Sequence, residues 1–140
     1  KWARDRIDEG RSRAGRGDQH KLTVFALYAV DEDAGAAKRV ARETLAFYKA
    51  AGGRNALTDV AGISDELVEM SSRGGAETVA AEMPDAWVED LTVAGRPSEV
   101  AKKIEALFSA GADSVCLFPA AGETVIETIE LTAEKVLPRL

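Results

Sequence analysis

An arginine at a predicted turn between a strand and a helix is the first residue of this sequence that could do chemistry. Arg96 follows Gly95 and precedes Pro97, where an apolar run gives way to a helical pattern. A guanidinium beside the start of a helix can hold a phosphate or a carboxylate together with backbone N–H groups. Arg96 and Gly95 are therefore candidates for binding a cofactor or a substrate. The alternative is an arginine that is simply exposed to solvent.

Two aromatic side chains stand near the ends of predicted strands, where α/β enzymes build their pockets. Tyr28 lies close to the end of the run 22–30, and its hydroxyl is a candidate contact for a substrate. Phe118 and Pro119 close the run 112–119 and are candidates for a pocket wall. The structural alternatives are a buried strand tyrosine with a satisfied hydroxyl and a core phenylalanine followed by a strand stop.

Residue types that bind metals or act as nucleophiles are scarce. The single cysteine, Cys116, lies inside a predicted strand, where a cysteine is typically a small buried hydrophobe. The single histidine, His20, precedes the first strand and is expected on the surface. The acids at 31–33 fit the first turn of a helix better than a cation site. One histidine and one cysteine cannot supply the usual zinc ligands, so we expect no metal site.

The composition excludes several classes of protein. The chain has 140 residues, 18 Lys and Arg against 24 Asp and Glu, a formal net charge of −6 and 46% hydrophobic residues. Such a chain can form one packed domain, and its negative charge argues against a nucleic-acid partner. One cysteine forms no intrachain disulfide, and the sequence contains no apolar signal or spanning segment. We expect a soluble, cytoplasmic protein that does not bind membranes.

Apolar runs alternate with helical patterns along the chain, which predicts an α/β fold with parallel strands. The expected strands are residues 22–30, 91–94 and 112–119, and the expected helices are an opening helix, residues 34–51, a helix after Pro97 and residues 123–137. The first and last strands have the pattern of strands buried on both faces. Residues 54–90 show only short helical pieces, which we interpret as a helical excursion. Periodicity alone leaves open both a doubly wound sheet and a slice of a barrel.

The first residues predict a fragment. The sequence begins at Lys1 without a methionine and is helical in pattern from the outset, with no capping residue ahead. Processing, a cloning boundary or proteolysis would each produce such a start. A complete (β/α)8 barrel needs about 250 residues, which excludes a whole barrel for residues 1–140. We therefore treat residues 1–140 as a single partial domain.

Two motifs in the last third of the chain carry a family resemblance. Residues 93–100, Val-Ala-Gly-Arg-Pro-Ser-Glu-Val, contain the pattern Gly-x-Pro-x-Glu-Val, and residues 110–115, Ala-Gly-Ala-Asp-Ser-Val, contain Ala-Gly-x-Asp before a hydrophobic strand. Together they resemble the carboxy-terminal signature of the bacterial luciferase-like oxidoreductases. The strand that ends at residues 29–33, followed by an Ala-rich helix, is similar to an earlier βα unit of that family.

The resemblance implies the carboxy-terminal part, about three βα units, of a TIM (β/α)8 barrel of more than twice this length. It also implies an oxidoreductase or monooxygenase that transfers a hydride between a deazaflavin, coenzyme F420, or alternatively FMN, and a small organic substrate. The Ala-rich, acidic sequence resembles the F420-dependent, methylenetetrahydromethanopterin-reductase-like branch. Most cofactor contacts in the family come from earlier strands, so we expect this piece alone to be inactive. Arg96 departs from the small capping residue that relatives carry, and a cation there is unfavourable unless it faces an anion.

Two classes of function therefore stand side by side. The first is a piece of a luciferase-like enzyme, whose cut barrel has open sheet edges and predicts self-association or pairing with another chain through them. The second is a free-standing acidic α/β module that binds or interacts without catalysis and shares only a common strand-to-helix turn. A closed sheet without exposed edges would favour the second class.

Overall fold

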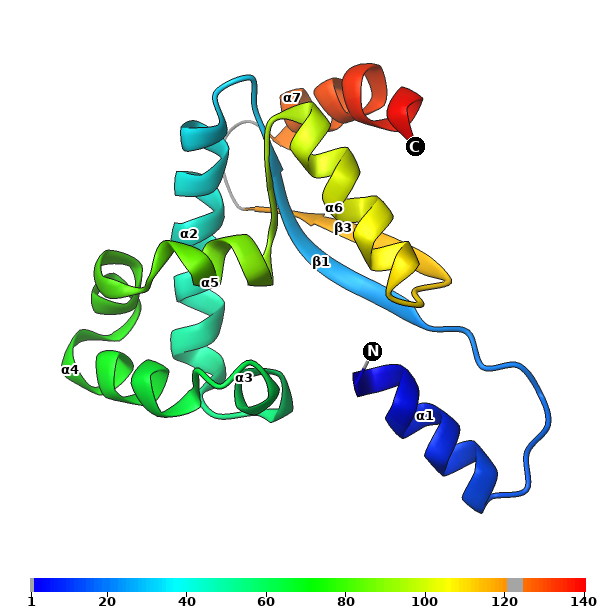
Figure 1. Cartoon of the computed structure of the whole chain (residues 1–140). Coiled ribbons are helices and arrows are strands. Elements are labelled where there is room, and N and C mark those ends of the chain that lie inside the picture. Colours follow the sequence, from blue (N-terminus) through cyan, green and yellow to red (C-terminus); the bar gives the residue numbers. More distant parts are fainter. Residues whose placement is uncertain (1, 121–124) are drawn as a thin grey trace.

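The computed structural model describes residues 2–120 and 125–140. Within them the helices and strands are α1 Trp2–Arg13, β1 Thr23–Val30, α2 Ala34–Gly52, α3 Ala56–Val60, α4 Ser64–Glu82, α5 Asp85–Leu91, β2 Val93–Gly95, α6 Pro97–Ser109, β3 Ser114–Pro119 and α7 Val125–Leu131 (Figure 1). A π-helical segment, Thr132–Val136, and a short 3₁₀ turn, Leu137–Arg139, end the chain. None of the helices in the described ranges is long and apolar enough to cross a membrane.

The three strands form one parallel sheet in the order β2-β1-β3, so β1 is central. In a closed barrel consecutive strands are neighbours, and β2 would lie between the other two. Here β1 has eight residues and β2 only three. β3 therefore forms more backbone hydrogen bonds by pairing with β1 than it could by pairing with β2. The predicted α/β class with parallel strands is confirmed. Within the described residues the central strand of this sheet is therefore β1.

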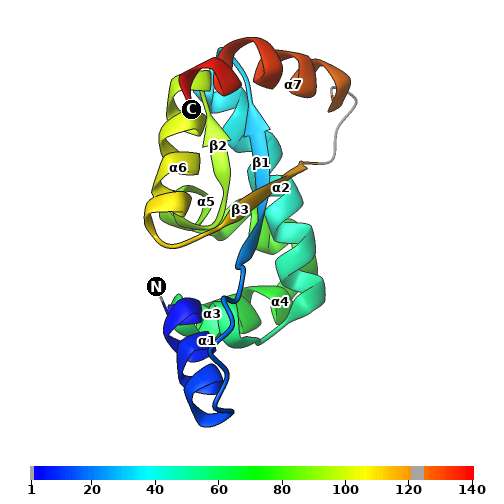
Figure 2. The ribbon, with the colours of Figure 1, turned by 90° about the vertical axis from the view of Figure 1, so that its right-hand side faces the viewer.

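Helices cover both faces of the sheet. Leu27 and Ala29 of β1 face the core formed with α2, α4 and α5, whereas Ala26, Tyr28 and Val30 face α6 and the π-helical segment. Figure 2 shows α2 and α6 on opposite sides of β1. Since neighbouring residues of a strand point to opposite faces, a strand covered on both sides must be apolar at every position. This explains the continuous apolar run that ends β1.

The prediction that the first and last strands are buried on both faces is only partly right. β1 is buried toward its carboxyl end, but Phe25 near its start is 75% exposed. β3 alternates, with Val115 and Leu117 half-buried and Cys116 and Phe118 exposed. The prediction of Cys116 as a buried hydrophobe is therefore wrong. The reason is tertiary, because β3 is an edge strand and α2 and α4 cover only the carboxyl half of one sheet face.

The boundary between α5 and the second strand differs from the expected one. Leu91, expected in the second strand, ends α5, because the hydroxyl of Thr92 donates to the Val88 carbonyl and holds the last turn of the helix (2.6 Å). Phe108, near the carboxyl end of α6, is exposed. The described part of the last helix begins at Val125, and Glu123 lies outside the described residues.

Between α2 and β2 the chain forms α3, α4 and α5, in the stretch where only short helices were expected. α4 is kinked at the Gly74-Gly75 pair, where Gly75 has φ of +63°. Arg42 of α2 donates to the carbonyl groups of Met83 (2.6 Å) and Ala80 (3.2 Å), which places a cation at the carboxyl end of α4. These helices are therefore tied to α2 as well as packed on it.

Asp113 explains the Ala-Gly-x-Asp motif. Its Oδ2 atom accepts hydrogen bonds from the Leu22 N–H and from Arg4 Nη2, both at 2.7 Å, while its own N–H donates to the Leu22 carbonyl at 2.8 Å. One carboxylate thus joins the starts of β1 and β3 and anchors α1. The hydrogen bonds from Leu22 and Arg4 lower the pKa of Asp113.

We predict that Asp113→Asn lowers the midpoint of urea unfolding at pH 7. A carboxyl group with a lowered folded pKa contributes stability that is complete above its unfolded pKa, about 3.9, and is lost as the pH falls through the folded value. The difference between variant and wild type should therefore shrink below about pH 4. Asp90→Asn is the control, because Asp90 is exposed and has no ion pair within the described residues. A constant difference between pH 3 and pH 7 would contradict this account.

Leu67 on α4 tests whether these helices form a packed core. It is completely buried, whereas its neighbour Val68 is about half exposed. We expect Leu67→Ala to lower the free energy of unfolding by about 2–5 kcal/mol, because it removes buried methyl groups and leaves a cavity. Val68→Ala should change it by about 0.5 kcal/mol or less. Equal effects of the two substitutions in urea unfolding would show that this region is not packed as described.

Candidate functional site

The turn from β2 into α6 is built by the Gly-x-Pro-x-Glu-Val motif. Gly95 has φ of +145°, and a Cβ atom there would lie 3.1 Å from Glu99 Cβ and 2.7 Å from Glu99 Oε2. Glu99 Oε2 accepts a hydrogen bond from the Arg96 N–H at 2.7 Å, and Pro97 is the first residue of the helix. Val100 then enters the core. The motif is therefore a tight, self-capped turn that requires glycine at its first position.

Arg96 lies at this turn with its side chain exposed to solvent. Its Nε atom donates to the Glu32 carbonyl at 3.2 Å, so the guanidinium spans the carboxyl ends of β1 and β2. A guanidinium has no acceptor and cannot cap the helix; Glu99 caps the backbone N–H instead. The connection after β1 runs over one sheet face and the connection after β2 over the other, and ligands of open α/β sheets bind at such a point.

An acidic hollow adjoins Arg96 at the end of β1. It has a volume of about 330 Å³ and is lined by Val30, Asp31, Glu32, Glu127, Thr128 and Leu131. Lys135 forms an ion pair with Glu32 and holds the π-helical segment against this edge. The hydrogen bond from Lys135 lowers the pKa of Glu32, and the nearby charges of Lys135, Arg139 and Arg96 lower it further. The edge therefore combines the exposed cations of Arg96, Lys135 and Arg139 with several carboxylates.

The other two predicted site residues do not join Arg96 and Gly95 in one pocket. Tyr28 is buried in the core under α6, and its carbonyl accepts from the Ala120 N–H at 2.8 Å. Phe118 lies on the opposite sheet face, with its ring centroid 6.1 Å from that of Tyr48. The alternation of a strand separates them, because Phe118 is in register with Leu27 rather than Tyr28.

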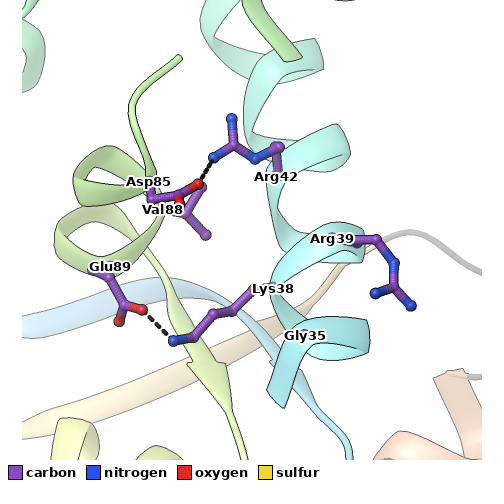
Figure 3. A pocket seen from close by; sticks show the side chains of 7 residues that line it. All are labelled: Gly35, Lys38, Arg39, Arg42, Asp85, Val88 and Glu89. Atoms are coloured by element: carbon purple, nitrogen blue, oxygen red, sulfur yellow. Dashed lines mark hydrogen bonds and ion pairs between the residues drawn. The ribbon is translucent and has the colours of Figure 1, made fainter. Parts of the chain in front are cut away.

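A charged groove lies between α2 and α5, with a volume of about 320 Å³ (Figure 3). Lys38 pairs with Glu89 and Arg42 with Asp85 across it, while Arg39 points away from both acids. Glu89 also accepts from Lys103 of α6 at 2.9 Å, and the hydrogen bonds from Lys38 and Lys103 lower the pKa of Glu89. This groove is therefore a set of ion pairs that joins helices from both sheet faces.

A second hollow is apolar and lies over the uncovered half of the sheet. This hollow has a volume of about 310 Å³ and is lined by Phe25, Tyr48, Leu57 and Phe118, among others. We refer to it as the aromatic hollow. Lys49 also lines it, and burial lowers the pKa of its ammonium group. Sequence reasoning missed Phe25, Tyr48 and Leu57. The available signal was the pair Phe47-Tyr48 on an otherwise Ala-rich helix.

No metal site is evident in the parts of the chain that the structure describes. Among residues 2–120 and 125–140, no group of three or more His, Cys, Asp or Glu side chains is placed to hold an ion. The acids at 31–33 act locally instead. Asp31 Oδ1 accepts from the Asp33 N–H at 2.8 Å, and Asp33 Oδ1 caps α2 by accepting from the Gly35 N–H at 2.9 Å.

Residues 1–114 match the sequence profile of the family described as luciferase-like monooxygenase. The 5,10-methylenetetrahydromethanopterin reductases of Archaeoglobus fulgidus and Methanopyrus kandleri are each 26% identical to the chain, covering 99% and 95% of it but only 44% and 39% of their own length. The chain thus spans less than half the length of these relatives.

A solved structure shows the same relation. The coenzyme F420 dependent tetrahydromethanopterin reductase from Methanopyrus kandleri superposes with a TM-score of 0.73 at 25% sequence identity. The superposition covers 94% of this chain and 39% of the reductase chain. The predicted fold, part of a TIM (β/α)8 barrel of more than twice this length, is confirmed by this match.

We predict that Glu32→Gln loosens the π-helical segment from the carboxyl edge. Loss of the charge weakens the pairing with Lys135, so the amides of Thr132–Val136 should exchange with solvent a few-fold faster at pH 7. Because the pKa of Glu32 is lowered in the folded chain, lowering the pH of the wild type through that value should have the same effect. Glu127→Gln is the control, since Glu127 lines the same hollow without pairing with Lys135. If the amide exchange rates of Thr132–Val136 are unchanged in Glu32→Gln, the ion pair between Glu32 and Lys135 does not hold the π-helical segment in place.

Proposed function

The chain belongs to the luciferase-like monooxygenase family, and we propose that it is the carboxy-terminal part of an oxidoreductase that transfers a hydride between coenzyme F420 and a small organic substrate. The observation that carries this proposal is the self-capped Gly95-Arg96 turn at the carboxyl edge of the sheet, in a chain that superposes on an F420 dependent reductase. Such edges are where barrel and open-sheet α/β enzymes place their ligands.

Arg96 and Gly95 are the residues we assign to ligand binding. The exposed guanidinium supplies a positive charge between the ends of β1 and β2, and it has only one hydrogen bond within the described residues, to the Glu32 carbonyl. It would hold a phosphate or carboxylate group of the coenzyme or substrate, while Gly95 lets the backbone approach closely. We also assign Tyr28, near the end of β1, and Phe118 to the walls of the completed site, which requires a site that reaches both faces of the sheet, because the two side chains lie on opposite faces. That assignment requires α6 to uncover Tyr28 in the longer protein, because α6 buries it here.

The residues present fit only a peripheral contact with the coenzyme. Three exposed cations lie near the acidic hollow: Lys135 is paired with Glu32, Arg139 donates to the Lys135 carbonyl at 2.7 Å, and Arg96 lies at the carboxyl ends of β1 and β2. Carboxylates of Asp31, Glu32 and Glu127 would repel further anionic groups. We therefore propose that the remainder of the longer protein binds most of the coenzyme and that this piece alone is inactive. Bound coenzyme would supply the hydride chemistry, and this chain would orient one anionic group.

The finer identity of the reaction follows the relatives. Both similar sequences are reductases of methylenetetrahydromethanopterin, and the similar structure is an F420 dependent reductase. F420 is therefore the proposed coenzyme, with FMN as the alternative, and reduction is favoured over a monooxygenase reaction. We also propose that the protein is cytoplasmic and that it pairs with itself or another chain through its open sheet edges.

A second candidate function is a free-standing acidic α/β module that binds a partner without catalysis. The observation that favours it is the coverage of both sheet faces, since α2 and α6 bury the carboxyl half of β1 without help from further strands. Its sheet is not closed, however, because β2 and β3 are both edge strands within the described residues. The open edges therefore favour the enzyme piece.

Titration of the chain with F420 and with inorganic phosphate, followed by amide chemical shifts, tests the assignment. We expect shifts at Gly95, Arg96 and residues 31–33, and about tenfold weaker binding in Arg96→Ala, because a charge-assisted hydrogen bond is lost. Arg73→Ala is the control, since Arg73 pairs with Glu82 on α4. The chain alone should show no turnover of reduced F420 with methylenetetrahydromethanopterin.

Each opposite outcome has a distinct meaning. Turnover by the chain alone would contradict the proposal that this piece is inactive. If F420 and phosphate bind Arg96→Ala as tightly as they bind the wild type, Arg96 does not contribute to the binding site. Failure of both ligands to shift the carboxyl edge would favour the module without catalysis.

A further inference from the structure

Glu32 contacts two cations of the carboxyl edge through two different groups. Its backbone carbonyl accepts a hydrogen bond from Arg96 Nε at 3.2 Å, and its carboxylate forms an ion pair with Lys135. Arg96 has this one hydrogen bond and no ion pair among the described residues. We propose that Lys135 is a positioning residue, which occupies the Glu32 carboxylate and so leaves the Arg96 guanidinium free to bind an anion.

The Glu32 carboxylate is a competitor for the Arg96 guanidinium. The hydrogen bond from Arg96 Nε holds the guanidinium beside the backbone of Glu32. The charge of Arg96 also contributes to the lowered pKa of Glu32, after the larger effects of Lys135 and Arg139, so it lies near the carboxylate. A carboxylate and a guanidinium form strong charge-assisted hydrogen bonds. If Glu32 turned from Lys135 to Arg96, it would therefore neutralise the cation that we assign to ligand binding.

The end of the chain brings Lys135 to this position. Figure 1 shows the last segment of the chain beside the start of α6 and the end of β1. Val136, the next residue after Lys135, is completely buried in the core under α6. The segment Thr132–Val136 is a π-helix, a rare conformation that is frequently found at functional sites. Lys135 is thus placed by core packing rather than by its exposed ion pair alone.

Arg139 is the other cation near Glu32, but it is a less suitable replacement for Lys135. Its Nε atom donates to the Lys135 carbonyl at 2.7 Å, so its guanidinium is already engaged with the π-helical segment. Arg96, in contrast, is tethered to Glu32 itself. When the Lys135 ammonium group is removed, we therefore expect Glu32 to pair with Arg96.

The other acids of this edge are less able to neutralise Arg96. Asp31 Oδ1 accepts from the Asp33 N–H at 2.8 Å, and Asp33 Oδ1 caps α2. Glu127 lies on α7, across the acidic hollow, and contacts no cation among the described residues. Glu32, whose backbone already contacts Arg96, is therefore the carboxylate that Lys135 has to occupy.

Titration with inorganic phosphate tests this inference, which rests on the proposed binding of an anion by Arg96. Lys135→Met should weaken phosphate binding about two- to fivefold, because the competing ion pair is exposed and modest in strength. The double variant Glu32→Gln, Lys135→Met should recover the wild-type affinity, because no competing carboxylate remains. Lys21→Met is the control, since it removes the same charge at an exposed position before β1.

The pKa of the Glu32 carboxyl group, followed by NMR, gives a second test without a ligand. The hydrogen bond from Lys135 is the main cause of the lowered pKa in the wild type. In Lys135→Met the pKa should stay below its ordinary value, because Arg96 takes over the carboxylate. Adding Arg96→Ala should then raise it toward that value. Unfolding curves check that each variant folds.

The outcomes separate the inference from the proposed function. Phosphate binding that stays weak in the double variant would overturn the inference, because Lys135 would then contact the anion itself. So would a Glu32 pKa in Lys135→Met that does not respond to Arg96→Ala, since Arg96 would then not replace Lys135. If the wild type binds no phosphate but the pKa values change as expected, the proposed function fails and the competition for Glu32 stands.

Discussion

The pairing of β1 on both of its edges is the constraint on which the rest of the structure depends. β1 is the longest of the three described strands, with eight residues, and β2 and β3 each pair with one of its edges. Once β3 takes the second edge, the crossover from β2 must pass over the face opposite α2. The two cores, the buried position of Tyr28 and the exposed outer edge of β3 all follow from that choice.

A few charged side chains hold this arrangement at points that the cores do not reach. Asp113 joins the starts of β1 and β3, Glu89 links α5 to lysines of α2 and α6, and Arg42 ties the end of α4 to α2. All of these are partly exposed, so each contributes modestly by itself. Together they fix the positions of the helices relative to the small sheet. Apolar packing alone specifies these positions only weakly.

The family motif has a structural role before it has a functional one. Gly95 permits the positive φ and the close approach of Glu99, Glu99 occupies the Arg96 N–H, and Pro97 starts the helix. This turn holds the exposed guanidinium of Arg96 at the carboxyl ends of β1 and β2. The unusual cation at the start of α6 is tolerated because Glu99 supplies the negative charge that the helix end favours.

The sequence by itself determined the order of helices and strands, the α/β class and the turn around Arg96, because these depend on local periodicity and backbone preferences. It also pointed to the family through two short motifs. Only the tertiary structure decided that β3 pairs with β1, that Phe118 and Tyr28 lie on opposite faces and that Cys116 is exposed. A strand's burial depends on which neighbours cover it, and those neighbours are distant in the chain. An apolar run such as Val115–Phe118 is therefore compatible both with an exposed edge strand and with a strand that is buried on both faces.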